Sequence, residues 1–172
     1  MLKLLGAALV LFACGLAGFG VARGYSRRPL ELRGLRAALQ MLETEIIYTA
    51  TPLAEAVERV AARAEPRIAP LFARSGEELR AMSGCSAREA WERGLAAFYP
   101  ATALKPADLA ILRQLGTSLG VSDRQDQSKH LHLAMEQLGL EMNKAAREAE
   151  RQVKLWNYLG FLGGLAVILL LY

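Results

Sequence analysis

The pattern of polar and apolar positions divides this chain into two charge-free ends and a charged middle. Of its 38 charged side chains, 37 lie between Arg23 and Lys154, and the other is Lys3. As helices, the apolar ends 4–22 and 155–172 would each be about 27 Å long, close to the roughly 30 Å hydrocarbon core of a bilayer. Because charge is costly in lipid, we predict transmembrane helices at 1–23 and 155–172. A helical domain, 24–154, would connect them.

Other interpretations of the ends remain open. Both ends could be buried helices of a soluble protein. The first end could be a cleaved signal peptide, because Lys3 precedes an apolar run that contains small residues. It could also carry a lipid on Cys14, since Leu11 to Cys14 faintly resembles a lipoprotein cleavage site. The apolar run continues past Cys14, which argues against that anchor.

Apolar spacing in the middle segment is helical throughout. Steps of three and four residues place Leu32, Leu35, Leu39, Leu42 and Ile46 on one stripe. Similar spacing predicts helices near 52–64, 68–79, 86–98 and 106–119, and a last helix from about residue 123. No convincing alternation or hairpin signal indicates a strand. The fold class is therefore all-α, a bundle of about six helices flanked by two terminal transmembrane helices.

Several residues predict where these helices begin and end. Thr51-Pro52 is typical of an N-cap followed by a first-turn proline. Ser86 and Glu89 have capping-box spacing. Ser75-Gly76 could interrupt the third helix, and Gly120 is placed to end the fifth. Since no breaker precedes Leu155, we expect the last helix to continue into the second membrane span.

Charge by position argues for lipid contact and against nucleic acid. Basic residues cluster beside both ends, including Arg23, Arg27 and Arg28, and Arg151 and Lys154, whereas 37–143 carries a net charge of −3. A nucleic-acid groove would need basic residues across the domain. Basic juxtamembrane residues attract anionic headgroups and favour the cytoplasmic side. The middle domain is therefore predicted to be cytoplasmic, with membrane lipids as partners.

The sequence shows no catalytic, cofactor or metal constellation. His130 and His132 would lie on opposite helix faces, so they are not a metal pair. The polar cluster Asp123, Arg124, Gln127 and His130 is either a helix cap or a candidate partner-binding face. Gly160 and Gly164 have the spacing of close membrane-helix packing, with the first span or a second copy, or are generic small residues. A small membrane-tethered enzyme using Cys85 or the Asp123/His130 face is the alternative of a different class.

Four segments resemble the stage III sporulation protein AB family of endospore-forming bacteria. They are the opening MLKLLGA, LRAALQMLETEI (35–46) with TPL (51–53), LGVSDRQDQSKH (119–130), and the ending LGFLGGLAVILLL (159–171). The resemblance spans the whole chain, although Pro66 to Phe98 matches only loosely.

The resemblance implies a function that the residue pattern alone does not give. The family's cytoplasmic domain is similar to the helical domain of inner-membrane platform proteins in type II secretion and type IV pili. The chain would be a non-enzymatic platform or adaptor in the mother-cell membrane around the forespore. It would couple a secretion-type ATPase to other stage III channel proteins, with homo-oligomerisation or a heteromeric partner supplying a second such domain.

Overall fold

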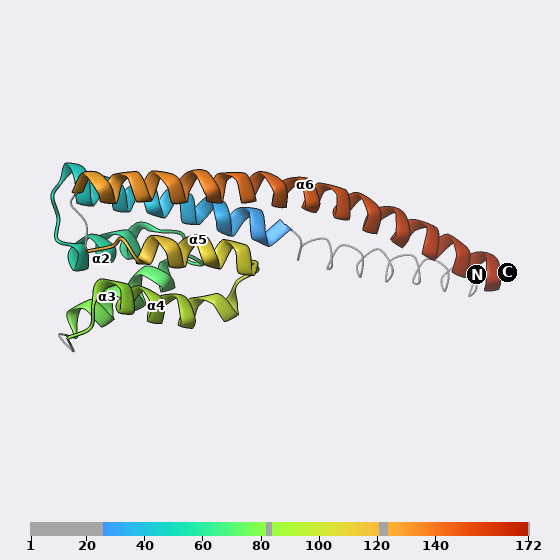
Figure 1. Cartoon of the computed structure of the whole chain (residues 1–172). Coiled ribbons are helices and arrows are strands. Elements are labelled where there is room, and N and C mark those ends of the chain that lie inside the picture. The colour runs from blue at the N-terminus through green and yellow to red at the C-terminus, as the bar shows by residue number, and fades with distance from the viewer. Residues whose placement is uncertain (1–25, 82–83, 121–123, 172) are drawn as a thin grey trace. The chain divides into compact units, whose positions relative to one another are not determined.

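The computed structural model describes residues 26–81, 84–120 and 124–171, and the side chains among them except those of 124 and 156–171. The first helix (residues 26–43) ends in the π-helix η1, Thr44–Tyr48. It is followed by α2 (Leu53–Arg63), α3 (Ala69–Arg80), α4 (Ala87–Phe98), the 3₁₀-helix η2 (Tyr99–Ala101), α5 (Pro106–Gly116) and α6 (Arg124–Leu171) (Figure 1). These ranges hold six α-helices and no strand, so the all-α prediction is confirmed for them.

No helix in the described part of the chain has the length and apolarity needed to cross a membrane. The predicted spans at 1–23 and 155–172, apart from Leu155, lie outside the residues whose side chains are described. The chain separates into two compact units, Arg28–Asn143 and a second made of Met1–Arg27 with Lys144–Tyr172. The predicted domain bounds 24–154 therefore stay a prediction.

The first helix contributes the stripe that its spacing predicts. Leu32, Leu35, Leu39 and Leu42 have no exposed surface, and Ile46 keeps only 5%. Within the unit 28–143, this helix runs antiparallel to α6, because Arg28 pairs with Glu141 while Glu43 pairs with Ser128. Burial of these side chains removes apolar area from water, which is the main favourable term in folding.

Helices α2 to α5 complete the bundle, with α3 packed against α2 and α4, and α4 against α5 (Figure 1). The α3–α4 contact includes an edge-to-face ring pair, Phe72 and Trp91, whose centroids are 5.7 Å apart. Ser75 and Gly76 are both buried inside α3, which continues to Arg80 without a break. The expected interruption there is wrong, because the Ser75 hydroxyl donates to the Leu71 carbonyl of its own helix.

Helix α4 packs tightly against α3 at Gly94. A Cβ added there would lie 3.0 Å from the Leu71 carbonyl oxygen and closer still to the Ser75 hydroxyl. A backbone atom cannot move aside cheaply, so the two helices would have to separate. The absence of a side chain at Gly94 therefore sets how closely α3 and α4 pack.

Replacing Gly94 with alanine should lower the free energy of unfolding by about 1–3 kcal/mol, because the added methyl overpacks a buried contact. Gly139→Ala is the matched control, since its Cβ would meet only the flexible Arg36 side chain, at 3.4 Å or more. There the higher helix propensity of alanine should raise stability by roughly 1 kcal/mol. Denaturant unfolding followed by circular dichroism measures both. Equal effects of the two substitutions would contradict the close packing inferred at Gly94.

Helix ends match the sequence at some positions and differ at others. The Ser86 hydroxyl accepts from the Glu89 amide while the Glu89 carboxylate accepts from the Ser86 amide, so the predicted capping box is confirmed. Helix α5 begins at Pro106 as expected but ends at Gly116. A turn follows it to Gly120, whose φ of +75° lies in the region that glycine favours.

Helix α6 is continuous from Arg124 to Leu171. The expected passage of the last helix into the apolar C-terminal segment is therefore confirmed as backbone. Leu131, Ala134 and Leu138 are buried along it, while Lys129, Leu133 and Leu140 are exposed.

Candidate interaction surface

The predicted partner-binding cluster lies at the start of α6 and is described only in part. Asp123 lies outside the described residues, and of Arg124 only the backbone is described. Gln127 is half-buried, and His130 is exposed. An exposed imidazole beside a half-buried amide can contact another protein, so the cluster stays a candidate surface.

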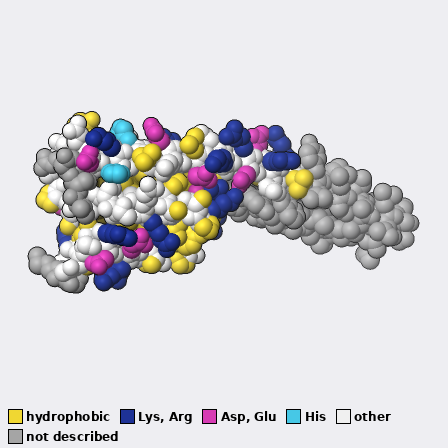
Figure 2. All heavy atoms as spheres, viewed as in Figure 1, with side chains coloured by type: hydrophobic (Ala, Val, Ile, Leu, Met, Phe, Trp, Pro, Cys, Tyr) yellow, Lys and Arg dark blue, Asp and Glu magenta, His cyan; other side chains and the backbone are white. Residues whose placement is uncertain are grey.

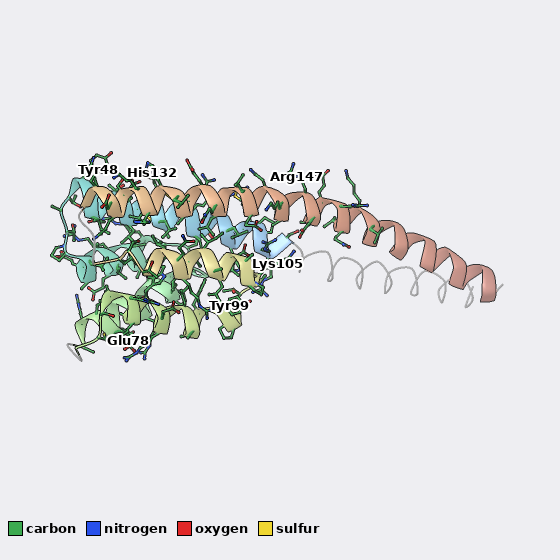
Figure 3. The ribbon with its side chains drawn as sticks, viewed as in Figure 1. Tyr48, Glu78, Tyr99, Lys105, His132 and Arg147 are labelled. Atoms are coloured by element: carbon green, nitrogen blue, oxygen red, sulfur yellow. The ribbon has the colours of Figure 1, made fainter. Side chains whose placement is uncertain are left out.

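A different histidine, His132, belongs to a polar cluster between the first helix and α6. The carboxylate oxygen Oε1 of Glu43, a side chain with 5% exposure, lies 2.9 Å from His132 Nδ1 and accepts from Ser128 Oγ at 2.8 Å. Its other oxygen accepts from Gln40 Nε2. The His132 ring is exposed, and Figure 3 shows it on the outer side of α6.

This cluster holds helices together and does not form a reaction centre. A serine nucleophile needs its hydroxyl bonded to the base, whereas Ser128 and His132 both contact the same Glu43 oxygen. Sequence analysis passed over Glu43, although a carboxylate beside an apolar stripe signals a paired polar residue. Pairing satisfies a carboxylate that would otherwise be costly to bury.

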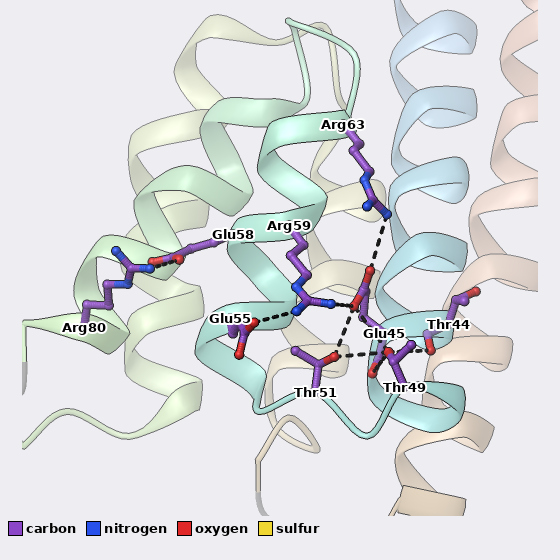
Figure 4. A network of polar contacts seen from close by, with 9 residues as sticks. All are labelled: Thr44, Glu45, Thr49, Thr51, Glu55, Glu58, Arg59, Arg63 and Arg80. Atoms are coloured by element: carbon purple, nitrogen blue, oxygen red, sulfur yellow. Dashed lines mark hydrogen bonds and ion pairs between the residues drawn. The ribbon is translucent and has the colours of Figure 1, made fainter.

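A second buried carboxylate, Glu45, anchors the π-helix to α2 (Figure 4). Its Oε2 accepts from Thr51 Oγ1 at 3.1 Å, Thr49 Oγ1 at 3.2 Å and Arg59 Nη1 at 3.0 Å. The Arg63 guanidinium approaches its Oε1 at 3.4 Å. Thr51 therefore binds Glu45 and does not cap α2, which has no side-chain cap, so the expected Thr51 N-cap is wrong. The carboxylate offers this hydroxyl a charged acceptor, and such bonds are stronger than neutral ones.

The Glu45 cluster should make stability depend on pH. Burial raises the pKa of Glu45. Hydrogen bonds from Thr51, Arg59 and Thr49 and the charge of Arg59 together lower this pKa by more than burial raises it, so it lies below its ordinary value of 4.5. A carboxylate with a depressed folded pKa stabilises the fold above its unfolded pKa. That contribution is lost as pH falls through the folded pKa.

The Glu45→Gln variant should therefore be less stable than the native chain at pH 7, and the difference should shrink on acidification below about pH 4. Urea midpoints at pH 7 and at about pH 3.5 measure this. Glu55→Gln is the control, since exposed Glu55 bonds the same Arg59 at 2.6 Å. A pH-independent gap for Glu45→Gln would contradict the predicted linkage.

A third cluster joins the first helix, α5 and α6 through Arg28. Its guanidinium donates from Nε and Nη2 to the two oxygens of Asp108, both at 2.8 Å, and from Nη2 to Glu141 at 2.9 Å. Asp108 is fully buried, and the Arg28 side chain is 8% exposed. Asp108 also accepts from the Lys105 amide at the start of α5. The prediction that Arg28 is a juxtamembrane basic residue facing lipid is therefore wrong, because its charge is paired inside the bundle.

The other predicted site residues have varied positions. Exposed Arg27 already takes part in a polar interaction, Arg151 and Lys154 are exposed on α6, and Lys154 pairs with Glu150. Arg23, Gly160 and Gly164 lie outside the described side chains, so no lipid or packing role is tested there. Cys85 is half-buried, and its thiol donates to the Glu78 carbonyl at 3.2 Å.

No group of three or more His, Cys, Asp or Glu side chains among the described residues could hold a metal ion. The polar clusters that the structure does bring together connect helices. Fold and clusters together define a helical bundle whose described internal charges are paired.

Comparison with known proteins identifies the family. A family model described as stage III sporulation protein AB matches residues 3–172. A Bacillus subtilis (strain 168) protein named stage III sporulation protein AB is 40% identical over 171 residues, covering 99% of each chain. A solved structure of stage III sporulation protein AB matches with a TM-score of 0.67 and 36% identity, over 72% of this chain and 97% of that chain. The chain belongs to the stage III sporulation protein AB family.

Proposed function

We propose that this protein is a non-enzymatic membrane adaptor in a channel complex between mother cell and forespore. Family membership supports a role in stage III of sporulation. The proposal goes further and assigns the protein to a channel complex and to the mother-cell membrane around the forespore. By analogy with secretion platforms, the bundle would lie in the cytoplasm and couple an ATPase to channel subunits.

The observation that carries this proposal is the continuity of α6. One helix, Arg124–Leu171, contains both bundle-facing residues and the charge-free segment that begins at Leu155. The side chains of Leu131, Ala134 and Leu138 are buried in the bundle. A helix without a break can transmit a displacement between a cytoplasmic partner and a membrane segment better than a flexible linker can. Such a connection suits an adaptor.

The start of α6 is the proposed partner surface, with the side chains of Gln127 and His130 on it. Its exposed imidazole and half-buried amide offer hydrogen bonds to a protein surface. The neighbouring cluster of Glu43, Ser128 and His132 fixes this part of α6 against the first helix. A surface held in place costs less to order when a partner binds.

Site-specific photo-crosslinking in sporulating cells tests the proposal. Photoreactive residues at 124, 127 and 130 should capture a secretion-type ATPase or another channel subunit. Positions 67 and 88, exposed arginines elsewhere in the bundle, serve as controls for non-specific capture. If positions 124–130 capture nothing beyond the control positions, this surface does not bind the proposed partners.

Two substitutions separate the adaptor from the enzyme alternative. Cys85→Ala should leave spore formation intact, because the thiol only donates to the Glu78 carbonyl. His130→Gln should weaken crosslinking to partners in proportion to its effect on sporulation. Loss of sporulation with complex assembly intact in either variant would favour chemistry and contradict the adaptor.

A further inference from the structure

Two arginines on α6, Arg147 and Arg151, have no ionic or hydrogen-bonding partner among the described side chains. Both are exposed and lie four residues apart, on the same helix face. Figure 3 shows Arg147 directed away from the helix. Other basic side chains do have acidic partners, since Lys154 pairs with Glu150 at 2.8 Å and Arg28 is buried against Asp108. Among the basic residues of 144–154, Arg147 and Arg151 are therefore the two that have no partner among the described side chains.

The distance of Arg151 from the apolar segment matches the depth of lipid headgroups, and Arg147 lies about one helical turn farther out. Arg151 precedes Leu155 by four residues and Arg147 precedes it by eight, which is about 6 and 12 Å along a helix. The headgroup region of one leaflet is about 5–7 Å thick. A long arginine side chain can bring its charged group several ångströms toward that layer. This step rests on the proposed membrane placement of the segment that starts at Leu155.

The chemistry of the two groups fits a phosphate ligand. A guanidinium is planar, always charged and able to donate two parallel hydrogen bonds to a phosphate. Dark blue basic side chains lie along the outer side of α6 in Figure 2. The segment 144–154 has four basic and two acidic residues, so its net charge is +2. A zwitterionic headgroup would gain little from that charge, whereas an anionic headgroup is attracted.

We propose that Arg147 and Arg151 form a binding site for the phosphate of an anionic phospholipid on the cytoplasmic leaflet. Headgroup binding on one face fixes both the depth and the rotation of α6.

Lipid binding to the full chain in nonionic detergent tests this site, with native mass spectrometry as the readout. Phosphatidylglycerol should bind about 25-fold more tightly than phosphatidylcholine, about fivefold for each arginine. The double variant Arg147→Gln/Arg151→Gln should lose this preference. The control Arg67→Gln/Arg88→Gln removes the same charge from exposed arginines of the bundle that have no partner among the described residues, and it should keep the preference.

Three results would overturn the proposal. These are equal binding of the two lipids by the native chain, an unchanged preference in the Arg147/Arg151 variant, and displacement of phosphatidylglycerol by equimolar inorganic phosphate. The last would make free phosphate, not lipid, the ligand. Alkaline carbonate extraction of cell membranes separates the two levels of failure. If the native chain stays in the membrane without a lipid preference, only the headgroup site fails. If carbonate releases the chain, the proposed membrane placement fails.

Discussion

Asp108→Ala should lower the free energy of unfolding by about 3–5 kcal/mol, because it leaves the charge of Arg28 buried without its main partner. The hydrogen bonds from Arg28 to Asp108 raise the pKa of the guanidinium more than burial lowers it, and the pairing with Glu141 raises it further. A guanidinium is always charged in proteins, so in the variant Arg28 cannot relieve its burial by losing a proton. The variant also loses the bond from the Lys105 amide that starts α5.

Denaturant unfolding of the detergent-solubilised chain measures this loss, with helix content followed by circular dichroism. Glu141→Gln is the matched control, because Glu141 contacts Arg28 through one bond and its side chain is 18% exposed. Its effect should be clearly smaller. The double variant Arg28→Met/Asp108→Leu should recover much of the stability, since replacing a buried pair with apolar groups is often neutral or better. A loss below about 1 kcal/mol in Asp108→Ala would show that the pair is dispensable.

Trp91→Ala should be about as damaging, with an expected loss of about 3–5 kcal/mol. The indole is 1% exposed and packs edge to face on Phe72. It also fills the space beside Gly116, where an added Cβ would lie 2.5 Å from its Cδ1. Its Nε1 donates to the Leu112 carbonyl of α5 at 2.7 Å. Removing the ring therefore leaves a cavity between α3, α4 and α5.

Trp91→Phe separates packing from hydrogen bonding. It keeps most of the ring contact with Phe72 and loses the bond to the Leu112 carbonyl, so a loss of about 1–2 kcal/mol is expected. The same unfolding experiment measures both variants. If Trp91→Phe were as damaging as Trp91→Ala, the hydrogen bond and not the filled volume would dominate at this position.

The helices could be predicted from the sequence because their signals are local. Apolar steps of three and four residues marked the buried stripe of the first helix, and Ser86 with Glu89 marked the start of α4. Local signals misled where a distant residue competed. Thr51 has the form of an N-cap, but its hydroxyl binds Glu45, six residues earlier and across a turn. Ser75 and Gly76 resemble a break but are both buried, Ser75 against Gly94 of α4 and Gly76 against Val57 and Glu58 of α2.

Only part of the candidate site could be predicted in the same way. Arg28 has the position of a juxtamembrane basic residue, yet its partners Asp108 and Glu141 are 80 and 113 residues away. No local pattern reports a pairing at that separation. Arg147 and Arg151 differ from neighbouring basic residues in lacking a partner among the described side chains, and only the structure shows which neighbours have one. The partner-binding role of the start of α6 stays a prediction, as do the packing roles of Gly160 and Gly164.

By itself the sequence determined the all-α class, the number of helices, the charge-free ends and the family, because periodicity, charge and motif are properties of consecutive residues. Tertiary structure alone decided which charges are consumed inside the bundle and which stay available. It paired Arg28 with Asp108, Glu43 with His132, and Glu45 with Arg59, and it left Arg147 and Arg151 without a partner among the described side chains. The physical reason is that an ion pair depends on the distance between side chains in space, which the folded bundle sets.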